Sequence, residues 1–422
     1  MLDIRLFRED PERIKEGARR KRFPRDGEVD RIVALDGEIR SLLPELEGLR
    51  AEQKRAGKAM GKASPEERAA LLEKQKDLKS RIKELEAKRK SLEEELESLL
   101  LLIPNPPDPD VPEGEDEEDN VEVRRWGEPP SFSFEPRDHV ELGEMHGLMD
   151  FQRAGKIAGS RNYFLKGKAV LLEEAILRFA LDHMVKKGFT PLVVPLLVRD
   201  EAMRGTGYYP GGEEQAYRVE KDGLSLVGTA EVPLTAYHGG EILAEEDLPV
   251  RLVARSYCFR REAGTYGKDT RGLYRVHQFQ KVEQVIVDVA DVERSKAHQE
   301  EILKNAEEVL QALGMPYRVV DVCGGELGMG QVRKYDLETW MPSRGNYGET
   351  HSASRFHEFQ ARRLNLRYRD KEGKVRFCHT LNNTVVASPR ILIPLLENLQ
   401  REDGSIPVPE CLHPYLDFTE IP

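Results

Sequence analysis

The residues with the clearest capacity for chemistry lie between Cys258 and Glu283, where charged side chains flank a long loop. Arg260 closes a predicted strand, and its planar guanidinium has the geometry to hold a phosphate through two hydrogen bonds. The loop after it, residues 265–274, is rich in Lys, Arg and Gly, which suits backbone contacts to a nucleic acid. From these residues alone, a phosphate-binding site and a solvated hairpin are equally acceptable interpretations.

Two common phosphate-binding signatures are absent from the sequence. There is no Gly-x-x-x-x-Gly-Lys-Ser/Thr loop, and no GxGxxG follows a predicted strand. If the chain uses ATP, it must therefore hold the phosphates in a different way.

Length and charge narrow the classes of protein that remain. At 422 residues the chain is expected to form two or more units, and its 33% charged and 39% hydrophobic residues are typical of a globular protein. The net charge of −11 gives no overall attraction to nucleic acid, so any RNA contact needs a local basic patch. The charged start, MLDIRLFREDPE, has no apolar leader segment, and the longest apolar run, near Leu99–Ile103, is too short to cross a bilayer.

The cysteines are scattered along the chain, with no CxxC pair and no His at metal-binding spacing. The sequence therefore predicts neither a local zinc site nor a disulfide framework. Free thiols in a reducing compartment are the better interpretation, and we expect a cytoplasmic protein. The cysteines are Cys258, Cys323, Cys378 and Cys411.

Residues 30–102 have the spacing of a coiled coil. Apolar residues recur every three or four positions in the first half, and leucines recur every seven in the second. Between the halves, Ser64, Pro65 and Glu67 form the signature of a capped helix start. Two helices joined by a short turn must run antiparallel, so the pattern predicts a hairpin arm. The seam positions are Ile32, Leu35, Ile39, Leu42, Leu46, Leu49, Gln53, Ala56 and Met60, then Leu71, Leu78, Ile82, Leu85, Leu92, Leu96 and Leu99.

The rest of the chain differs from the arm in composition and in its pattern of apolar residues. Residues 103–120 are rich in Pro and acidic residues, cannot form a packed core and are predicted to be a linker between the N-terminal domain, residues 1–102, and a larger C-terminal domain. From 121 to 422, short β-rich runs alternate with amphipathic helices, which predicts an α+β domain with a mainly antiparallel sheet flanked by helices. The predicted strands are 191–198, 251–259 and 275–289, and the predicted helices are 169–187, 292–313 and 390–400.

The segment FRREAGTYGKDTRGLYRVHQFQKVEQ, residues 259–284, resembles motif 2 of the class II aminoacyl-tRNA synthetases in the form found in seryl-tRNA synthetases. Other similar segments follow in the order of that family, and the arm and linker match as well, so the resemblance covers essentially the whole chain. One such motif would be weak, but this many in order are specific. They are GTG at 205–207, after a strand around Pro195 that resembles motif 1, GTAE at 228–231, YDLE at 335–338, ETHSAS at 349–354, FQARR at 359–363 and LNNT at 381–384.

The resemblance implies a site for ATP and Mg²⁺. Arg260 would hold the α-phosphate and stabilise the charge that grows there in the transition state, and Arg260, Glu283 and Arg390 would carry the catalysis. Glu349 and Ser352 would hold Mg²⁺, since their oxygens suit that hard ion. The remaining expected ATP contacts are Glu262 near the adenine amino group, Arg275 at the γ-phosphate, Phe279 and Arg390 on the two faces of the adenine, and Val276, Thr350 and His351 within the same motifs.

The resemblance also implies a pocket for serine. The need is for carboxylates that bind the ammonium group and for donors and acceptors that bind a small hydroxyl. A site built to hydrogen-bond an OH rejects alanine and glycine, because its buried polar groups would go unpaired, whereas rejecting threonine needs a steric wall. Either Glu231 or Glu283 could take the ammonium, and the sequence leaves that choice open. The matching positions are Thr229, Ala230, Glu231, Arg260, Glu283 and Thr384.

The implied reaction has two steps. The serine carboxylate attacks the α-phosphorus of ATP to give seryl-adenylate and pyrophosphate, and the 3′-terminal adenosine of tRNA(Ser) then accepts the serine. Positioning and charge stabilisation carry such a reaction, so no protein nucleophile is expected. His351 is a poor candidate for an essential base.

The arm by itself favours a generic interaction rod or a dimerisation zipper. In the seryl-tRNA synthetases, however, it reaches across a homodimer to the elbow and long extra arm of the tRNA. Lys54, Lys58 and Lys62 share one helical face near the tip, and such a patch would contact phosphates rather than read bases. The expected tRNA-binding residues are Arg50, Lys54, Arg55, Lys58 and Lys62. The family implies that tRNA(Sec) is charged as well, where that tRNA exists.

Three alternatives compete with this interpretation. An amino-acid:carrier-protein ligase would activate an amino acid without charging tRNA, but such relatives lack the arm. A different class II specificity, such as threonine, would leave the serine-type TAE and NNT segments unexplained. A coiled-coil RNA-binding scaffold with an inactive catalytic domain would be expected to have lost some of Arg260, Glu283, Glu349 and Arg390, all of which are present.

Overall fold

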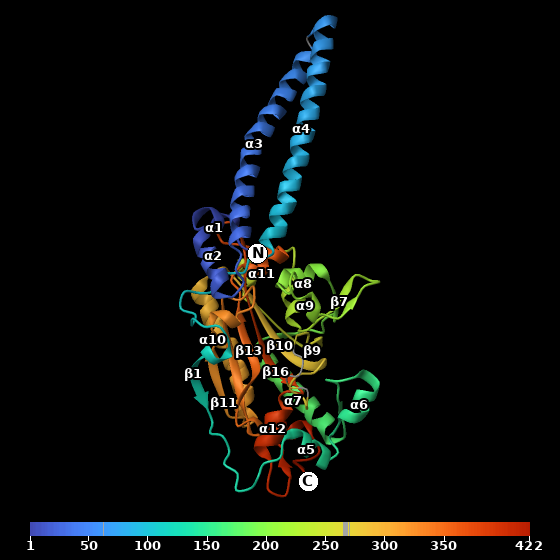
Figure 1. The fold of residues 1–422 in the computed structure, drawn as a ribbon, viewed down its shortest axis with the longest axis vertical. Coiled ribbons are helices and arrows are strands. Elements are labelled where there is room, and N and C mark those ends of the chain that lie inside the picture. The colour runs from blue at the N-terminus through green and yellow to red at the C-terminus, as the bar shows by residue number, and fades with distance from the viewer. Residues whose placement is uncertain (62, 265–268, 270) are drawn as a thin grey trace. The chain divides into compact units, whose positions relative to one another are not determined.

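The computed structural model describes residues 1–61, 63–264, 269 and 271–422 of the chain. These residues form two compact units, Met1–Pro106 and Pro107–Pro422. The first unit is helical, and the second is a sheet surrounded by helices (Figure 1). In the part of the chain that the structure describes, no helix is both long enough and apolar enough to span a membrane.

The first unit consists of two short helices followed by two long ones. The long helix α4 begins as its sequence predicts, with a capping box. The Ser64 side chain accepts a hydrogen bond from the backbone N–H of Glu67 at 3.3 Å, and the Glu67 carboxylate accepts one from the N–H of Ser64 at 2.8 Å. Such a cap contributes about 1 kcal/mol to helix stability. The helices are α1 (Ile4–Glu9), α2 (Pro11–Arg20), α3 (Asp26–Met60) and α4 (Pro65–Leu100).

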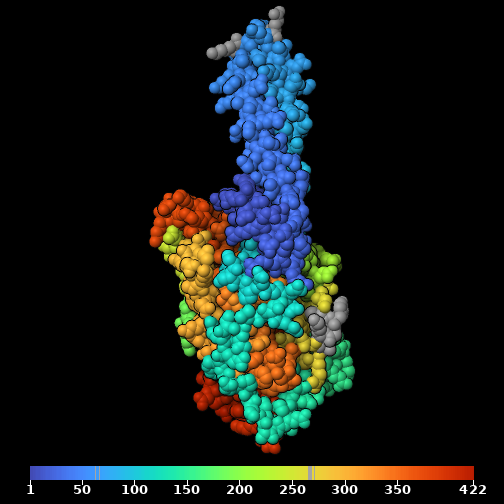
Figure 2. All heavy atoms as spheres, turned by 60° about the vertical axis from the view of Figure 1, so that its left-hand side comes forward, coloured from blue at the N-terminus to red at the C-terminus, as the bar shows by residue number. Residues whose placement is uncertain are grey.

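The predicted seam holds α3 and α4 together. Leu35, Leu42 and Leu46 of α3 are buried against apolar side chains of α4. The two helices lie side by side along the arm in the space-filling view (Figure 2). Burying one such leucine contributes roughly 1.5–3 kcal/mol, so the seam is the main stabilising feature of an otherwise charged hairpin. The α4 partners are Ile82, Leu85 and Leu92, with Leu96 and Leu99 at the edge.

The second unit is organised by one large sheet. All neighbouring strands pair antiparallel except β4 and β9, which are parallel. The predicted class, a mainly antiparallel sheet flanked by helices, is confirmed. In spatial order the strands are β1 (Val121–Trp126), β11 (Tyr317–Asp321), β12 (Arg333–Met341), β13 (Asn346–Arg355), β16 (His379–Ser388), β10 (Gln278–Asp288), β9 (Val250–Phe259) and β4 (Thr190–Pro191).

The two faces of the sheet have different coverings. On one face, α7 (Lys168–Lys186), α10 (Val292–Ala312) and α12 (Leu392–Leu399) close the main apolar core. On the other face, α9 (Glu231–Thr235) and α11 (Phe359–Leu364) cover a smaller core over part of β9 and β10. The central strands are therefore open on this second face wherever the smaller core ends.

Shorter elements complete the unit. The α-helices are α5 (His139–Met145), α6 (Phe151–Ala158) and α8 (Asp200–Thr206). The short 3₁₀ helices are η1 (Glu117–Asp119), η2 (Glu213–Gln215), η3 (Glu245–Asp247), η4 (Gly324–Glu326), η5 (Pro342–Arg344) and η6 (Glu410–Tyr415). The small sheets pair β2 (Met149–Asp150) with β3 (Phe164–Leu165), β17 (Ile406–Pro407) with β18 (Glu420–Ile421), β7 (Leu224–Leu226) with β5 (Leu197–Arg199) and β6 (Arg218–Val219), and β14 (Arg367–Arg369) with β8 (Ile242–Ala244) and β15 (Val375–Phe377).

One predicted strand is wrong. Residues 191–198 are strand only at their ends, in β4 and β5, and the segment between them is irregular. Pro191 and Pro195 lack the N–H that a strand interior needs, which limits pairing here to the edge of the sheet. The predicted strands 251–259 and 275–289 correspond to β9 and β10, and the predicted helices 169–187, 292–313 and 390–400 correspond to α7, α10 and α12, with differences of one to three residues at their ends.

The proline-rich segment that comes after the arm packs on the second unit from Pro107 onward. Val111 is buried against Val322 and Leu327. The Asp108 carboxylate forms an ion pair with the guanidinium of Arg355, whose side chain is only 1% exposed. These contacts hold the segment against the second unit before β1 begins.

Candidate active site

Strand β10 forms the floor of the site through the alternation of its side chains. Val282 and Ile286 belong to the main core. Phe279, Lys281 and Glu283 therefore face the opposite, open side of the sheet. This alternation brings an aromatic ring, an ammonium and a carboxylate into one row.

A bulge in β16 changes which of its residues join that row. Val282 pairs with Val386 and Glu283 pairs with Thr384, so Val385 is an extra residue without a partner on β10. Val385 and Val386 are both in the main core. Thr384 consequently faces the open side together with Ala387 instead of Val386.

A second bulge lies in β13, where Thr350 has no partner residue on β12. In a regular strand Glu349 and His351 would point to the same face, and Ser352 to the other. The extra residue turns Glu349 to the face that carries Ser352. Both side chains line the same cavity.

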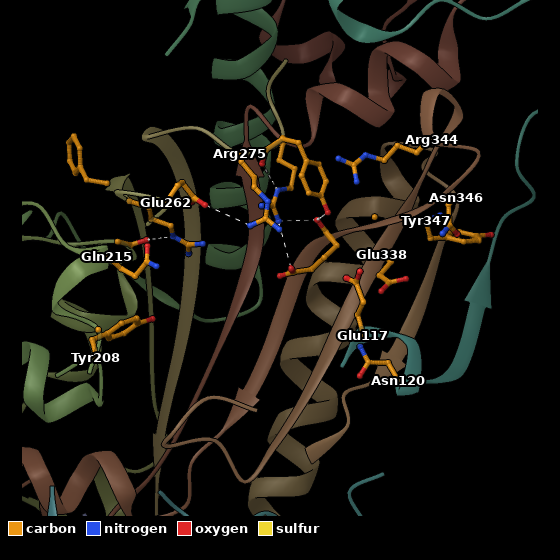
Figure 3. A pocket seen from close by; sticks show the side chains of 18 of the residues that line it. Glu117, Asn120, Tyr208, Gln215, Glu262, Arg275, Glu338, Arg344, Asn346 and Tyr347 are labelled. Carbon is orange, nitrogen blue, oxygen red and sulfur yellow. Dashed lines mark hydrogen bonds and ion pairs between the residues drawn. The ribbon is translucent and has the colours of Figure 1, made fainter. Parts of the chain in front are cut away.

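These strands border two adjacent cavities that share part of their lining. The inner one has a volume of about 130 Å³, below the roughly 300 Å³ at which drug-sized pockets begin, and the outer one has about 1020 Å³. Figure 3 shows the lining of the outer cavity. Its charged residues come from η1, from strands β11, β12 and β13, and from the segments after β9, before β10, before β13 and after β16. The residues that line both cavities are Tyr208, Arg260, Glu262, Tyr274, Glu349 and Arg390.

The structure brings most of the sequence-predicted site residues together. Arg275 lines the outer cavity only. Ala230 and Glu283 line neither cavity, because Ala230 is buried in the smaller core and Glu283 lies beneath Lys281. Those that line the inner cavity are Thr229, Glu231, Arg260, Glu262, Val276, Phe279, Glu349, Thr350, His351, Ser352, Thr384 and Arg390.

Glu283 is fully buried and already neutralised. It forms an ion pair with Lys281, and the two side chains are 0% and 6% exposed. The oxygen that pairs with Lys281 also accepts a hydrogen bond from Thr384 at 3.3 Å, and the other oxygen accepts one from Asn382 at 2.9 Å. The Lys281 ammonium also donates to the hydroxyl of Thr229 at 2.7 Å. The charges of Glu283 and Lys281 are therefore satisfied within the protein. The side-chain oxygen of Asn382, which lines the inner cavity, is buried without a hydrogen-bond partner among the described residues.

Glu231 is a buried carboxylate that no cationic side chain among the described residues contacts directly. Tyr208 donates to one of its oxygens and Gln360 to the other, both at 2.8 Å. Burial, with a smaller contribution from the charge of Glu283, raises the pKa of Glu231 to about 7. A cation placed beside Glu231 would favour the ionised form of the carboxylate and so offset the cost of its burial. Glu231 is therefore suited to bind a positively charged group.

Glu349 also lines the inner cavity, together with the arginines Arg260 and Arg390. Burial alone would raise the pKa of Glu349, but the charges of Arg390, Lys334, Arg260 and Arg275 outweigh it and lower the pKa. Glu349 is therefore ionised and available to a cation. In the described part of the chain, no group of three or more His, Cys, Asp or Glu side chains is arranged to hold a metal.

Aromatic rings and guanidiniums are stacked next to these charges. The Arg260 guanidinium lies 5.1 Å from the centre of the Phe279 ring. The Arg390 guanidinium lies 4.4 Å from the centre of the Tyr274 ring and donates to the carbonyl of Glu349 at 3.0 Å. Such stacking fixes the planes of the guanidiniums that face the cavities.

His351 has no role as a base near neutral pH. Burial lowers the pKa of its imidazole to about 3, so the ring is neutral. Its Nδ1 lies 2.8 Å from the hydroxyl of Thr350. These contacts indicate a structural side chain beneath the bulge.

Sequence reasoning did not assign four residues that contact the carboxylates. Lys281 and Asn382 contact Glu283, and Tyr208 and Gln360 contact Glu231. The two-residue alternation of a strand would have identified Lys281, which lies between Phe279 and Glu283. Tyr208 and Gln360 lie far from Glu231 in sequence, and no local signal could have found them.

The basic residues expected at the tip of the arm are exposed where the structure describes them. Arg50, Lys54, Arg55 and Lys58 lie on the surface of α3, and Arg50 forms an ion pair of 2.6 Å with Glu86. Lys62 lies outside the described residues, as do residues 265–268 and 270 of the loop after motif 2.

Comparison with known proteins agrees with this geometry. The family model of the tRNA synthetase class II core domain (G, H, P, S and T) matches residues 217–399, and that of the seryl-tRNA synthetase N-terminal domain matches residues 1–107. A serine–tRNA ligase of Deinococcus radiodurans is 48% identical over 421 residues, covering 100% of this chain and 99% of that protein. The chain belongs to the seryl-tRNA synthetases. As a member of this family it is an enzyme, a serine–tRNA ligase.

Solved structures of seryl-tRNA synthetases have the same fold. The seryl-tRNA synthetase of Pyrococcus horikoshii, solved in complex with ATP, is 42% identical with a TM-score of 0.95, covering 100% of this chain and 99% of that one. The serine–tRNA ligase of Naegleria fowleri, solved with AMP, is 33% identical with a TM-score of 0.89, covering 100% and 98%. This match extends over the helical unit as well as the catalytic unit.

Proposed function

We propose that the inner cavity of this seryl-tRNA synthetase binds serine and that the outer cavity binds the phosphates of ATP. One observation carries the proposal. The inner cavity holds a carboxylate without a cation, Glu231, beside a second carboxylate that Lys281 neutralises, and it opens onto arginines. Such a site matches a small zwitterion that reacts with a polyphosphate.

The charges also suggest how serine is oriented. Its ammonium pairs with Glu231, since Glu283 already has a cation in Lys281. The serine hydroxyl then lies by Thr229, Lys281 and Thr384, which line the inner cavity over the buried Glu283 and offer both donors and acceptors. The backbone around Ala230 contributes to the wall of the pocket. An amino acid without the hydroxyl would leave this buried cluster with an unmatched polar group, which disfavours alanine.

Arg260 is the residue that joins the two cavities. It lines both of them, and its Nε donates to the carbonyl of Gly228 at 3.3 Å, which leaves the Nη atoms to the ligand. Its guanidinium binds the α-phosphate while the serine carboxylate attacks. A charge placed there before reaction stabilises the transition state more than the ground state.

The remaining nucleotide contacts are assigned from the lining of the two cavities. Phe279 and Arg390 hold the two faces of the adenine, and Glu262 accepts from its amino group with Val276 alongside. Arg275 reaches the γ-phosphate from the outer cavity. The structure of the Pyrococcus horikoshii relative with ATP supports a nucleotide site in this fold.

The donor set fits a magnesium ion. Glu349 is ionised and shares a cavity with the hydroxyl of Ser352, and carboxylate and hydroxyl oxygens suit Mg²⁺. The ion would be held by these two side chains, with Thr350 and His351 supporting the bulge that places them. When bound, it would neutralise phosphate charge. The groups of this chain then act by binding and orienting the two substrates.

The N-terminal region, residues 1–102, acts as the tRNA-binding domain, 103–120 as the connection and 121–422 as the catalytic domain. The exposed basic residues of α3, Arg50, Lys54, Arg55 and Lys58, contact tRNA phosphates, and Lys62 is placed with them by sequence. Substrates of the second step are tRNA(Ser) and, where it exists, tRNA(Sec). The enzyme works in the cytoplasm.

A homodimer completes the proposal. Between β4 and β5, in the segment that resembles motif 1, Val193 is fully exposed, and Leu197 at the start of β5 is 44% exposed, so these apolar side chains are available to a second copy of the chain. Val193→Glu would then convert a dimer into monomers in light scattering, whereas an unchanged mass would place the interface elsewhere.

The test is ATP–pyrophosphate exchange with each of the twenty amino acids, in the absence and presence of tRNA. Exchange with serine alone and without tRNA supports the assignment of both cavities. Exchange with another amino acid would contradict the pocket assignment while leaving the fold intact. Charging of serine onto tRNA then separates this enzyme from a ligase that loads a carrier protein.

A further inference from the structure

The hairpin between β12 and β13 places an arginine in the outer cavity. Arg344 is the last residue of η5, at the tip of this hairpin, and its side chain is 36% exposed. Figure 3 shows Arg344 among the residues that line the cavity, together with Arg275. Neither the motifs nor the strand alternation pointed to Arg344.

The backbone that carries Arg344 is anchored. The N–H of the preceding residue, Ser343, donates to the carboxylate of Glu397 at 3.0 Å, and its hydroxyl donates to the same group at 2.9 Å. Glu397 is fully buried on α12. The position of the Arg344 side chain is therefore set by the main fold and is not left to an isolated surface turn.

The Arg344 guanidinium is stacked. It lies 3.8 Å from the centre of the Tyr274 ring, while Arg390 lies 4.4 Å from the same centre. Tyr274 thus orients two guanidiniums that line the cavity. This stacking restricts the orientation of the Arg344 side chain, whereas a fully solvated arginine would be free to adopt many rotamers.

A single carboxylate joins Arg344 to Arg275. One oxygen of Asp269 accepts from Arg275 Nε at 3.1 Å, and the other oxygen accepts from Arg344 Nη2. The two guanidiniums thus bind the two oxygens of one carboxylate. The same arrangement can bind two oxygens of one phosphate. Asp269 therefore lies against the two guanidiniums in the position that an anionic ligand would take.

We propose that Arg344 is a further phosphate-binding residue, which works with Arg275 on the terminal phosphates of ATP and on pyrophosphate. This inference rests on the proposed function, because it assumes that Arg275 reaches the γ-phosphate. Asp269 holds the two arginines in place while the cavity is empty, and the terminal phosphate replaces its carboxylate when ATP binds.

The experiment compares Arg344→Gln, Arg275→Gln and Arg376→Gln. Arg376 is a matched control, since it also pairs with an aspartate, Asp370, but lies on β15 away from both cavities. Removing a charged hydrogen-bond partner costs about ten-fold or more in affinity. Arg344→Gln and Arg275→Gln are therefore each expected to weaken ATP and pyrophosphate binding by roughly ten-fold or more, and Arg376→Gln is expected to change neither.

Binding of AMP separates this role from a structural one. AMP lacks the terminal phosphates, so Arg344→Gln is expected to bind it with an affinity within about two-fold of that of the parent enzyme. Equal losses of ATP and AMP binding would mean that Arg344 only supports Tyr274, and the proposal would be overturned. Arg344→Lys, which keeps the charge without the planar fork, is expected to restore part of the ATP affinity.

The outcomes also separate this inference from the proposed function. If Arg275→Gln weakens ATP binding and Arg344→Gln does not, the phosphate site stands and Arg344 is no part of it. If neither Arg275→Gln nor Arg260→Gln affects ATP, the nucleotide site itself is misplaced. Asp269→Asn is expected to tighten pyrophosphate binding by a few-fold, and a loss as large as that of Arg344→Gln would contradict the role of Asp269 as a substitute anion.

Discussion

Replacing Glu231 with glutamine should make the empty enzyme more stable and its serine binding weaker. The carboxylate is 5% exposed and has no cation in contact, and its pKa is raised by burial to about 7. The folded protein therefore keeps a proton on Glu231 that the unfolded chain releases at a lower pH. The stability that this proton provides is full below about pH 4.5 and is lost as the pH rises through about 7.

The size of the effect can be worked out from the two pKa values. Glu231 moves from an ordinary 4.5 to about 7. At 1.36 kcal/mol per unit, ionised Glu231 costs the folded state about 3 kcal/mol above pH 7. Glutamine cannot ionise, and it can still accept from Gln360 and donate to the hydroxyl of Tyr208. The stability advantage of Glu231→Gln over the parent should therefore grow by about 2–3 kcal/mol as the pH rises from 5 to 8.5.

Urea unfolding of the ligand-free protein measures this difference. Both tryptophans, Trp126 and Trp340, lie in the second unit, so their fluorescence reports the unit that contains Glu231. Serine titrations provide the second measurement. Under the proposed assignment ionised Glu231 pairs with the ammonium, so the serine affinity of the parent should rise up to ten-fold per pH unit below about pH 7 and level off above it. Glu231→Gln should bind serine roughly ten-fold or more weakly at neutral pH.

Glu173→Gln is the matched control. Burial also raises the pKa of Glu173, which accepts a hydrogen bond from Ser388 at 2.7 Å and lines neither cavity. It should share the direction of the stability change at high pH and leave serine affinity unaltered. If Glu231→Gln shows no pH-dependent gain in stability, the desolvation argument is wrong. If it binds serine normally, the ammonium must pair with Glu283 instead.

Three further predictions concern other parts of the molecule. Lys281→Met leaves Glu283 buried without its cation, which should cost about 3–5 kcal/mol in urea unfolding and weaken serine binding, and unchanged stability would contradict the ion pair. Arg260→Gln should lower the turnover of serine-dependent pyrophosphate exchange by about 10²–10³-fold, and a change confined to KM would show that Arg260 binds without stabilising the transition state. Replacing both Lys54 and Lys58 with alanine should leave exchange without tRNA unchanged, raise KM for tRNA and reduce its salt dependence, whereas unchanged tRNA kinetics would remove α3 from the interface.

The sequence predicts best where a single periodic signal dominates. The leucine heptads located the seam of the arm, and the Ser64 signature located the start of α4, because both depend on neighbours within one or two helical turns. The strand around Pro195 was predicted wrongly, because its apolar residues resemble a buried strand although its prolines cannot pair. Local composition could not distinguish these two cases.

The roles of the two glutamates could not be read from the sequence. Glu231 and Glu283 have the same side chain and similar expected partners, and only the fold shows that Lys281 is committed to Glu283. Tyr208 and Gln360 reach Glu231 from α8's C-terminal loop and from α11, respectively. Burial and long-range partners set the difference in charge, and neither is encoded in a short motif.

The spacing of the site residues has a physical reason that a regular strand would not provide. Glu349 and Ser352 are three residues apart, and so are Thr384 and Ala387, which would place the members of each pair on opposite faces of a flat strand. Each pair shares a face because one extra residue lies between its members, in β13 and in β16. A pattern of period two would have assigned Glu349 to the core beside His351. The bulges thus convert two core strands into walls of a polar cavity without removing the apolar side chains that hold the sheet on its other face.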